Sequence, residues 1–159
     1  MVIKENTNML LFRFRDFGKY NFIDTHREFI EKNGYVWLLK IGKKTSCEKI
    51  SEIQREGGWM ILRSPKADGG KSYIVKYVDY SEKTPKDGMF PKYYEEVINS
   101  EDFWEATCQW FMIDRISSLS DESAKTLVMA KTEKPIDEVI GATRTAVMFV
   151  KNVAPITLD

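Results

Sequence analysis

Short apolar runs separated by turn residues constrain the fold of this chain more than any other feature. The clearest run spans residues 35–41, is rich in aromatic and branched side chains, and follows a helical pattern that ends at Gly34. Such runs are typical of buried strands, and a glycine suits the left-handed conformation that often follows a helix. Six or seven strands with three or four short helices predict an α+β fold. We expect a small, strongly curved β-barrel, because closure removes exposed sheet edges.

The predicted elements follow one another without internal repeats. We expect strands at residues 9–14, 35–41, 59–63, 71–80, 103–116, 125–130 and 144–150, and helices at residues 22–33, 93–99 and 135–140. A further helix begins after Ser46, a good N-cap, and ends at Gly57-Gly58. The turn at 64–70 predicts a β-hairpin, whereas 81–90 is the longest loop and 117–123 a turn. The strand at 103–116 is long enough to require a bend or bulge.

Composition limits the function classes. The 159 residues fit one domain, residues 1–159, and 43% hydrophobic content with 13% aromatic content indicates a globular chain with a core. The 24 basic and 24 acidic residues argue against a strongly electrostatic nucleic-acid binder, although a local basic patch is compatible with this balance. Cys47 and Cys108 lack metal or redox spacing. Without a signal peptide or an apolar run of about 18 residues, we expect a cytoplasmic protein with reduced thiols.

Aromatic residues at strand ends and turns are the main functional clue, because they can line a pocket as well as fill a core. His26, the only histidine, either is a helix residue with a satisfied ring nitrogen or points into a pocket beside Trp37. Trp37 itself either packs in the core or stacks on a flat ligand. Lys40, Lys43 and Lys44 form either a solvated turn or a set of phosphate contacts.

Other motifs carry little chemistry. Trp104 and Trp110 lie six residues apart on the predicted long strand and would share one face if no bulge intervenes. Adjacent acidic pairs point apart, Ser64 lacks the context of a nucleophile, and the glycines at 69–70 fit a hairpin turn better than a phosphate loop. With no metal motif and no catalytic triad in the sequence, we expect no cofactor.

Five motifs together resemble a known superfamily. They are Met9-Leu-Leu-Phe-Arg-Phe14, His26, Gly34-Tyr-Val-Trp37 with Lys40, Pro91-Lys-Tyr-Tyr94, and Trp110-Phe-Met-Ile-Asp-Arg-Ile116. The segment 134–140, which contains the predicted helix at 135–140, and the closing strand at 144–150 fit the same pattern. This arrangement resembles the PUA-like superfamily, and within it the EVE, YTH and ASCH group of prokaryotic conflict and modification-dependent restriction systems. The resemblance implies a curved barrel with helices at its ends. EVE and YTH members bind a flipped, modified base in an aromatic cage, whereas ASCH relatives include RNA-binding modules and amidohydrolases of acetylated cytidine.

By this resemblance, the chain is a nucleic-acid-binding module for DNA or RNA with a modified base, in a cytoplasmic defence or RNA-handling context and without a membrane. The base-binding candidates are Trp37, Trp59, Tyr93, Tyr94 and Trp110, with His26, Lys40 and Ser64 as polar readers. The phosphate-contacting candidates are Arg13, Arg15, Lys43 and Lys44. One alternative is a small ASCH-type amidohydrolase that uses Lys40 with a carboxylate and a hydroxyl. The other is a nucleotide-sensing or protein-interaction domain that uses the same pocket, which acidic flanking residues would favour.

Overall fold

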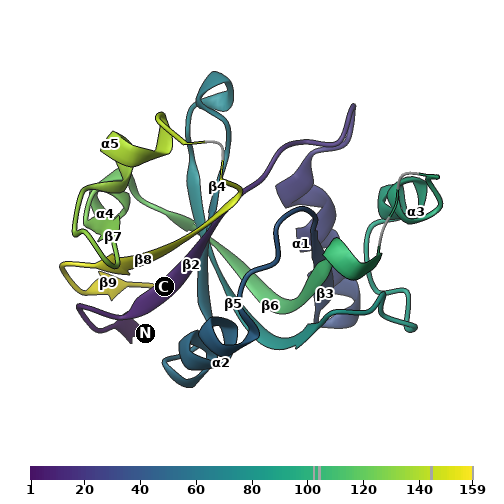
Figure 1. Cartoon of the computed structure of the whole chain (residues 1–159), viewed down its shortest axis with the longest axis horizontal. Coiled ribbons are helices and arrows are strands. Elements are labelled where there is room, and N and C mark those ends of the chain that lie inside the picture. The colour runs from purple at the N-terminus through teal and green to yellow at the C-terminus, as the bar shows by residue number, and fades with distance from the viewer. Residues whose placement is uncertain (102, 104, 144, 159) are drawn as a thin grey trace.

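A mixed β-sheet of seven strands forms the centre of the molecule (Figure 1). The computed structural model describes residues 1–101, 103, 105–143 and 145–158. The sheet contains β2 (Asn8–Arg13), β3 (Val36–Lys40), β4 (Trp59–Arg63), β5 (Ser72–Ser81), β6 (Gln109–Leu119), β7 (Leu127–Met129) and β8 (Val147–Asn152). Their order is β3-β6-β5-β4-β2-β8-β7, and every neighbouring pair is antiparallel except β2 and β4. The strands β1 (Val2–Ile3) and β9 (Ile156–Thr157) form a separate two-stranded sheet.

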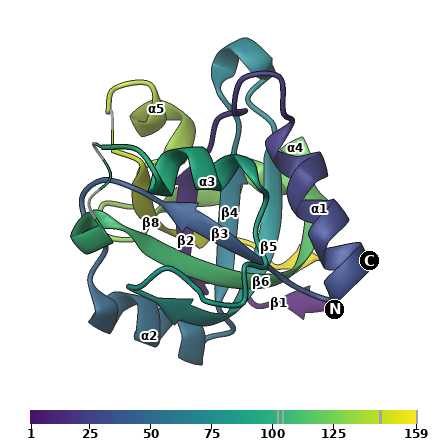
Figure 2. The same cartoon turned by 90° about the vertical axis from the view of Figure 1, so that its right-hand side faces the viewer.

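Helices lie around this sheet and confirm the predicted α+β class. They are α1 (Phe22–Asn33), α2 (Cys47–Arg55), α3 (Tyr93–Ile98), α4 (Asp121–Ala124) and α5 (Ile136–Ile140), with the 3-10 helices η1 (Lys66–Asp68) and η2 (Glu105–Thr107). Figure 2 shows α1 and α3 on the side of the molecule where β3 lies. Among the described residues, the five α-helices exceed the three or four that were expected.

The predicted closure into a β-barrel is wrong. The sheet ends at β3 and β7, which lie on opposite sides of the molecule (Figure 1). Chain segments cover both outer edges. The Trp37 N–H donates to Met89 O at 2.8 Å, and the Met129 N–H donates to Lys134 O at 2.8 Å. These segments form hydrogen bonds with backbone groups of the edge strands that barrel closure would otherwise pair. The open sheet therefore does not leave both edges without partners.

Local capping explains the helix boundaries. The Asn21 side chain accepts a hydrogen bond from Asp24 N at 2.9 Å and begins α1, and Gly34 ends this helix with φ 86°. The predicted helix at 22–33 is therefore confirmed with both of its ends. Ser46 caps α2 as predicted, although α2 ends at Arg55, before the two glycines.

The region from 100 to 124 differs most from the prediction. The long strand begins at Gln109 and not at residue 103, because the 3-10 helix η2 precedes it. The strand continues to Leu119, and the expected turn at 117–123 gives way to α4, whose N-cap Ser120 accepts from Ser123 N at 3.2 Å. The expected irregularity is present, since the pairing of β5 with β6 shifts register on both sides of Tyr77.

The core divides into three clusters. One face of the sheet packs Leu10, Leu38 and other residues against α1 and α2, and the second cluster packs Leu11 and its neighbours beneath α4 and α5. The third cluster lies between β3, β6 and α3 and contains Trp37 and Trp110. The parallel pair β2–β4 brings the carboxyl-terminal ends of two strands to the same end of the sheet, and the candidate site lies there.

Candidate functional site: a basic cavity beside an aromatic cleft

Two arginines stand side by side where the parallel strands end. Arg13 on β2 is the register partner of Arg63 on β4. In open α/β sheets, ligands commonly bind outside the carboxyl ends of the parallel strands, and β2–β4 is the parallel pair of this sheet. Arg15 lies two residues after β2, and Ser64 directly follows β4, so polar side chains collect at this end of the sheet.

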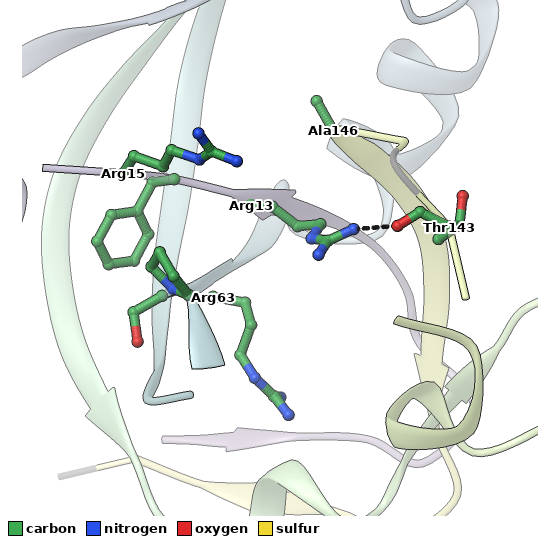
Figure 3. Close-up of a pocket in the computed structure, with 8 residues that line it drawn as sticks. Arg13, Arg15, Arg63, Thr143 and Ala146 are labelled. Carbon is green, nitrogen blue, oxygen red and sulfur yellow. Dashed lines mark hydrogen bonds between the residues drawn. The ribbon is translucent and has the colours of Figure 1, made fainter. Parts of the chain in front are cut away.

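A cavity of about 470 Å³ lies at the carboxyl-terminal ends of β2 and β4. We call it the basic cavity. Its lining residues are Arg13, Phe14, Arg15, Arg63, Ser64, Pro65, Thr143 and Ala146. Figure 3 shows the three arginines around the cavity, with Arg13 reaching toward Thr143. None of these described lining residues is acidic, so the cavity is suited to an anion.

The three arginines are held to different degrees. Arg13 Nη1 donates to Thr143 O at 2.6 Å. Arg63 Nη1 donates to Ser72 Oγ at 3.1 Å, its Nη2 pairs with Asp137 Oδ1 at 2.5 Å, and its side chain is only 12% exposed. Arg15 is exposed and makes no ion pair within the described part of the chain. Two guanidinium groups are therefore pre-oriented, and the third is free to reach a ligand.

A second cavity, of about 370 Å³, adjoins the first and is mainly apolar. We call it the aromatic cleft. It is lined by Phe12, Arg13, Phe14, Arg15, Phe17, Phe22, Leu39, Ile41, Tyr93, Tyr94, Val97 and Ala146. Arg13, Phe14, Arg15 and Ala146 also line the basic cavity. One ligand could therefore place a flat ring in the cleft and an anionic group beside it.

Tyr93 is held in the cleft by two stacked rings and a hydrogen bond. Phe17 and Tyr20 both stack on it, with centroid distances of 5.1 and 5.3 Å and interplanar angles of 15° and 17°. Its hydroxyl lies 2.7 Å from Thr25 Oγ1. Burial is the main cause that raises the pKa of Tyr93, so this hydroxyl stays protonated and able to hydrogen-bond.

His26 supports the neighbouring ring, Tyr94. Its Nδ1 lies 2.7 Å from Phe22 O, and because a carbonyl can only accept, Nδ1 carries the proton. Its Nε2 then accepts from the Tyr94 hydroxyl at 2.7 Å. Burial lowers the pKa of His26 to about 4, against the opposite effect of the hydrogen bond to Phe22. Both ring nitrogens of His26 are thus satisfied, and its side chain is fully buried.

The tryptophan candidates do not gather around the cleft. Trp37 donates from Nε1 to Asp87 Oδ2 at 3.2 Å, and Trp59 belongs to the second core cluster, with Lys76 Nζ 5.5 Å from its ring centroid. Trp110 is fully buried in the third cluster. Trp104, expected to share a face with Trp110, lies outside the described residues. Of the five predicted base-binding residues, only Tyr93 and Tyr94 line the cleft.

Lys40 points inward. Its Nζ donates to Lys43 O and to Gln109 Oε1, the latter at 3.2 Å, and the residue is 1% exposed. Burial lowers the pKa of Lys40. Gln109 in turn bonds both backbone groups of Thr45, so this network fixes the loop that follows β3.

Lys43 and Lys44 belong to a different cavity from the arginines. A cavity of about 490 Å³ is lined by residues 41–46 and 145–147 with Phe149, and it shares Ile41 and Ala146 with the aromatic cleft. Lys44 pairs with Glu82 at 2.7 Å, whereas Lys43 is exposed. Cationic side chains therefore flank the cleft on two sides.

Sequence reasoning missed Arg63 and the phenylalanines that follow β2. A signal was present, because the apolar runs at 9–12 and 59–62 both end on an arginine. Their parallel pairing, which puts the two arginines together, was not visible in the sequence. Ser64, predicted as a polar reader, does line the basic cavity, and its Oγ accepts from Lys71 N at 2.8 Å.

Comparison of the chain with protein-family models, curated proteins and solved structures gives no significant match. Within the described part of the chain, each helix is too short or too polar to cross a lipid bilayer. The fold and the site define the protein only as an α+β protein with a mostly antiparallel sheet, a basic cavity and an adjoining aromatic cleft.

Proposed function

We propose that this protein is a nucleic-acid-binding module that takes an unstacked, modified base into the aromatic cleft. One observation carries the proposal: the cleft and the basic cavity share Arg13, Phe14, Arg15 and Ala146. A nucleotide combines a flat ring with an anion a few bonds away, and this juxtaposition of sites matches that combination.

The energetics of such a site are favourable. Stacking of a base on aromatic side chains contributes about 1–3 kcal/mol per base. Removing a base from a duplex costs a few kcal/mol, and less when the base is damaged or modified. Arg13 and Arg15 supply the sequence-independent phosphate contacts that position the strand. Lys43 and Lys44 flank the other side of the cleft and extend this basic surface.

The PUA-like resemblance is part of the proposal. An α+β chain with a bent sheet and helices near its ends is compatible with it, although the open sheet departs from a closed barrel. The base site proposed here differs from the cage inferred by resemblance, since it uses Tyr93 and Tyr94 with phenylalanines in place of the three tryptophans.

The alternatives receive less support. An amidohydrolase that uses Lys40 needs an accessible amine with a carboxylate nearby, but this side chain is buried against Lys43 O and Gln109. A small-ligand or protein-interaction pocket was expected to have acidic flanks, whereas the described residues that line the basic cavity include three arginines.

A binding titration tests the proposed function. Short fluorescent DNA and RNA oligonucleotides, single- and double-stranded, would each carry one unmodified, methylated or acetylated base, and Kd would be measured at two salt concentrations. We expect modification-dependent binding, and we expect Tyr93→Leu to raise Kd by about 5- to 150-fold, the range of one stacking contact, because Tyr93 supports the ring of Phe17 at the cleft.

Tyr35→Leu is the matched control. It removes an equivalent side chain from the margin of the same core cluster, but Tyr35 does not line the cleft. Its Kd should stay within about twofold of the wild-type value, and circular dichroism should show that both variants fold. If no oligonucleotide binds under any condition, the proposed function is wrong.

A further inference from the structure

We propose that the basic cavity binds a phosphomonoester, so that the ligand presents a phosphorylated strand end and not only internal phosphodiesters. The inference rests on the proposed function of the aromatic cleft and specifies which phosphate chemistry its neighbour recognises. A polynucleotide end or a free nucleotide could supply both the base and the phosphomonoester, and the experiment below separates these two sources.

Charge is the first argument. Three arginines and no described acidic residue line the cavity. Asp137, outside this lining, offsets one of the three charges through its pair with Arg63. About two uncompensated positive charges remain on Arg13 and Arg15. A phosphomonoester carries about −1.5 to −2 charges at pH 7, whereas a phosphodiester carries a single charge, so the monoester is the better match.

Donor geometry is the second argument. Arg13 and Arg63 are anchored through Thr143 O and Ser72 Oγ, so part of the entropy loss on ordering a guanidinium group is already incurred on folding. Guanidinium groups bind phosphate oxygens in a bidentate manner. Ser64 Oγ accepts from Lys71 N, which leaves the hydroxyl proton free to donate. The three non-ester oxygens of a monoester can use these donors better than the two of a diester.

The test uses one single-stranded sequence with four ends: a 5′-hydroxyl, a 5′-phosphate, a 3′-phosphate, and a 5′-phosphate blocked as its methyl ester. The matching free nucleoside monophosphate is the fifth ligand. Kd is measured for the wild type, Arg15→Gln and Arg55→Gln. Arg15 is exposed and unpaired among the described residues, so its substitution leaves the fold intact, and Arg55 is an exposed arginine on α2 outside these cavities.

We expect one of the two terminal phosphates, the 5′- or the 3′-phosphate, to lower Kd by about tenfold or more relative to the 5′-hydroxyl strand, since charge-assisted bidentate contacts are strong. The methyl ester should lose most of this gain. Arg15→Gln should remove the preference, because it weakens binding of the phosphorylated strand more than that of the hydroxyl-ended strand, and Arg55→Gln should keep the preference.

Each other result is decisive. Equal binding of all four strands would overturn the phosphomonoester inference and leave the proposed nucleic-acid binding in place. Binding of the free nucleotide alone would support the monoester site and overturn the polynucleotide source. If neither the strands nor the nucleotide bind, the phosphomonoester inference is wrong, and the titration with modified bases decides on the proposed function.

Discussion

At the scale of single residues, the buried pair His26 and Tyr94 links the core to the aromatic cleft. Tyr94 lines the cleft, and its hydroxyl donates to His26 Nε2. Burial raises the pKa of Tyr94 well above its usual value and lowers that of His26. The bond therefore joins two neutral groups near pH 7, and proton uptake by His26 would remove the lone pair on Nε2 that accepts it.

This arrangement predicts a loss of stability in mild acid. The pKa of His26 is about 4 in the folded protein and 6.5 in a model peptide, so between these values the unfolded state binds more protons. The free energy of unfolding should therefore fall as pH drops from about 6.5 to 4, by about 3 kcal/mol for a shift of this size. Urea denaturation at pH 7.5, 6 and 5 measures the effect.

His26→Gln is the control for this prediction, because an amide can accept from Tyr94 without titrating in this range. Its stability should be lower than that of the wild type at pH 7.5 but nearly flat down to pH 5. Glu82, whose pKa is lowered to about 2 mainly by hydrogen bonds from Cys47, Lys44 and Tyr80, contributes its own losses only below about pH 4.5. An equal pH slope in wild type and variant would assign the effect to other groups.

A glycine provides a second prediction at this scale. Gly58 has φ +71°, and a Cβ built on it would lie 2.5 Å from Tyr77 O, beside the register shift of β5. The backbone holds this approach, since Tyr77 N donates to Gly58 O at 2.9 Å. Gly58→Ala should lower the free energy of unfolding by about 3 kcal/mol, through a strained φ and a backbone clash.

Gly88→Ala is its matched control. Gly88 has a similar φ, +67°, but nothing lies within 4 Å of its hypothetical Cβ. This variant should lose only about 1 kcal/mol, the cost of the left-handed conformation alone. If urea denaturation finds equal losses for the two variants, the close approach at Tyr77 has no energetic weight.

At the scale of elements, the pair between β4 and α5 tunes the basic cavity. Arg63 lies on β4, and Asp137 lies in the first turn of α5. The carboxylate orients the guanidinium group and also offsets its charge. Because the Asp137 side chain is 56% exposed, solvent screens the pair and its contribution to stability is small.

We therefore expect Asp137→Asn to strengthen anion binding and to change stability little. The Kd for a 5′-phosphorylated oligonucleotide should fall by about two- to fivefold at low salt, and the free energy of unfolding should change by less than about 1 kcal/mol. Glu138→Gln, on the same helix and exposed, removes the same charge without the pair and should change Kd much less. Weaker binding by Asp137→Asn would mean that orientation of Arg63 outweighs its charge.

At the scale of the whole molecule, the net charge is zero, but basic side chains are concentrated in one region. The 24 basic and 24 acidic residues balance, yet Arg13, Arg15, Arg63, Lys43 and Lys44 lie around contiguous cavities. Interactions over this surface are set by local and not by net charge, because screening limits their range to about 8 Å at physiological salt.

Salt dependence follows from this distribution. If the site neutralises two or three phosphates of a single strand, log Kd should rise with log salt with a slope of about 1.4–2.1. Arg15→Gln should reduce the slope by about 0.7, and Arg55→Gln should leave it unchanged. Titrations between 50 and 300 mM salt, which span roughly the range in which counterion release dominates, measure the slopes. A slope near zero would show that binding does not use the basic cavity.

Much of the local structure was predictable from the sequence. The helix at 22–33 and the strand at 59–63 have the predicted bounds, and the hairpin turn at 64–70 joins two antiparallel strands as expected. These elements depend on local signals: a cap, a glycine in the left-handed region, an apolar run between turn residues. The short strands β1 and β9 were missed, because two-residue strands carry no periodicity and pair across the whole chain.

The candidate site depended on two kinds of information. The residue types at strand ends, arginines after apolar runs and tyrosines after Pro91, were determined by the sequence alone. Which of them meet was decided only by the tertiary structure. Parallel pairing of β2 with β4 places Arg13 beside Arg63. Tyr93 and Tyr94 pack in the same buried cluster as Trp37 and Trp110, but of these four residues only the two tyrosines also line the cleft. The physical reason is that strand pairing and core packing are long-range interactions, which no local pattern of residues encodes.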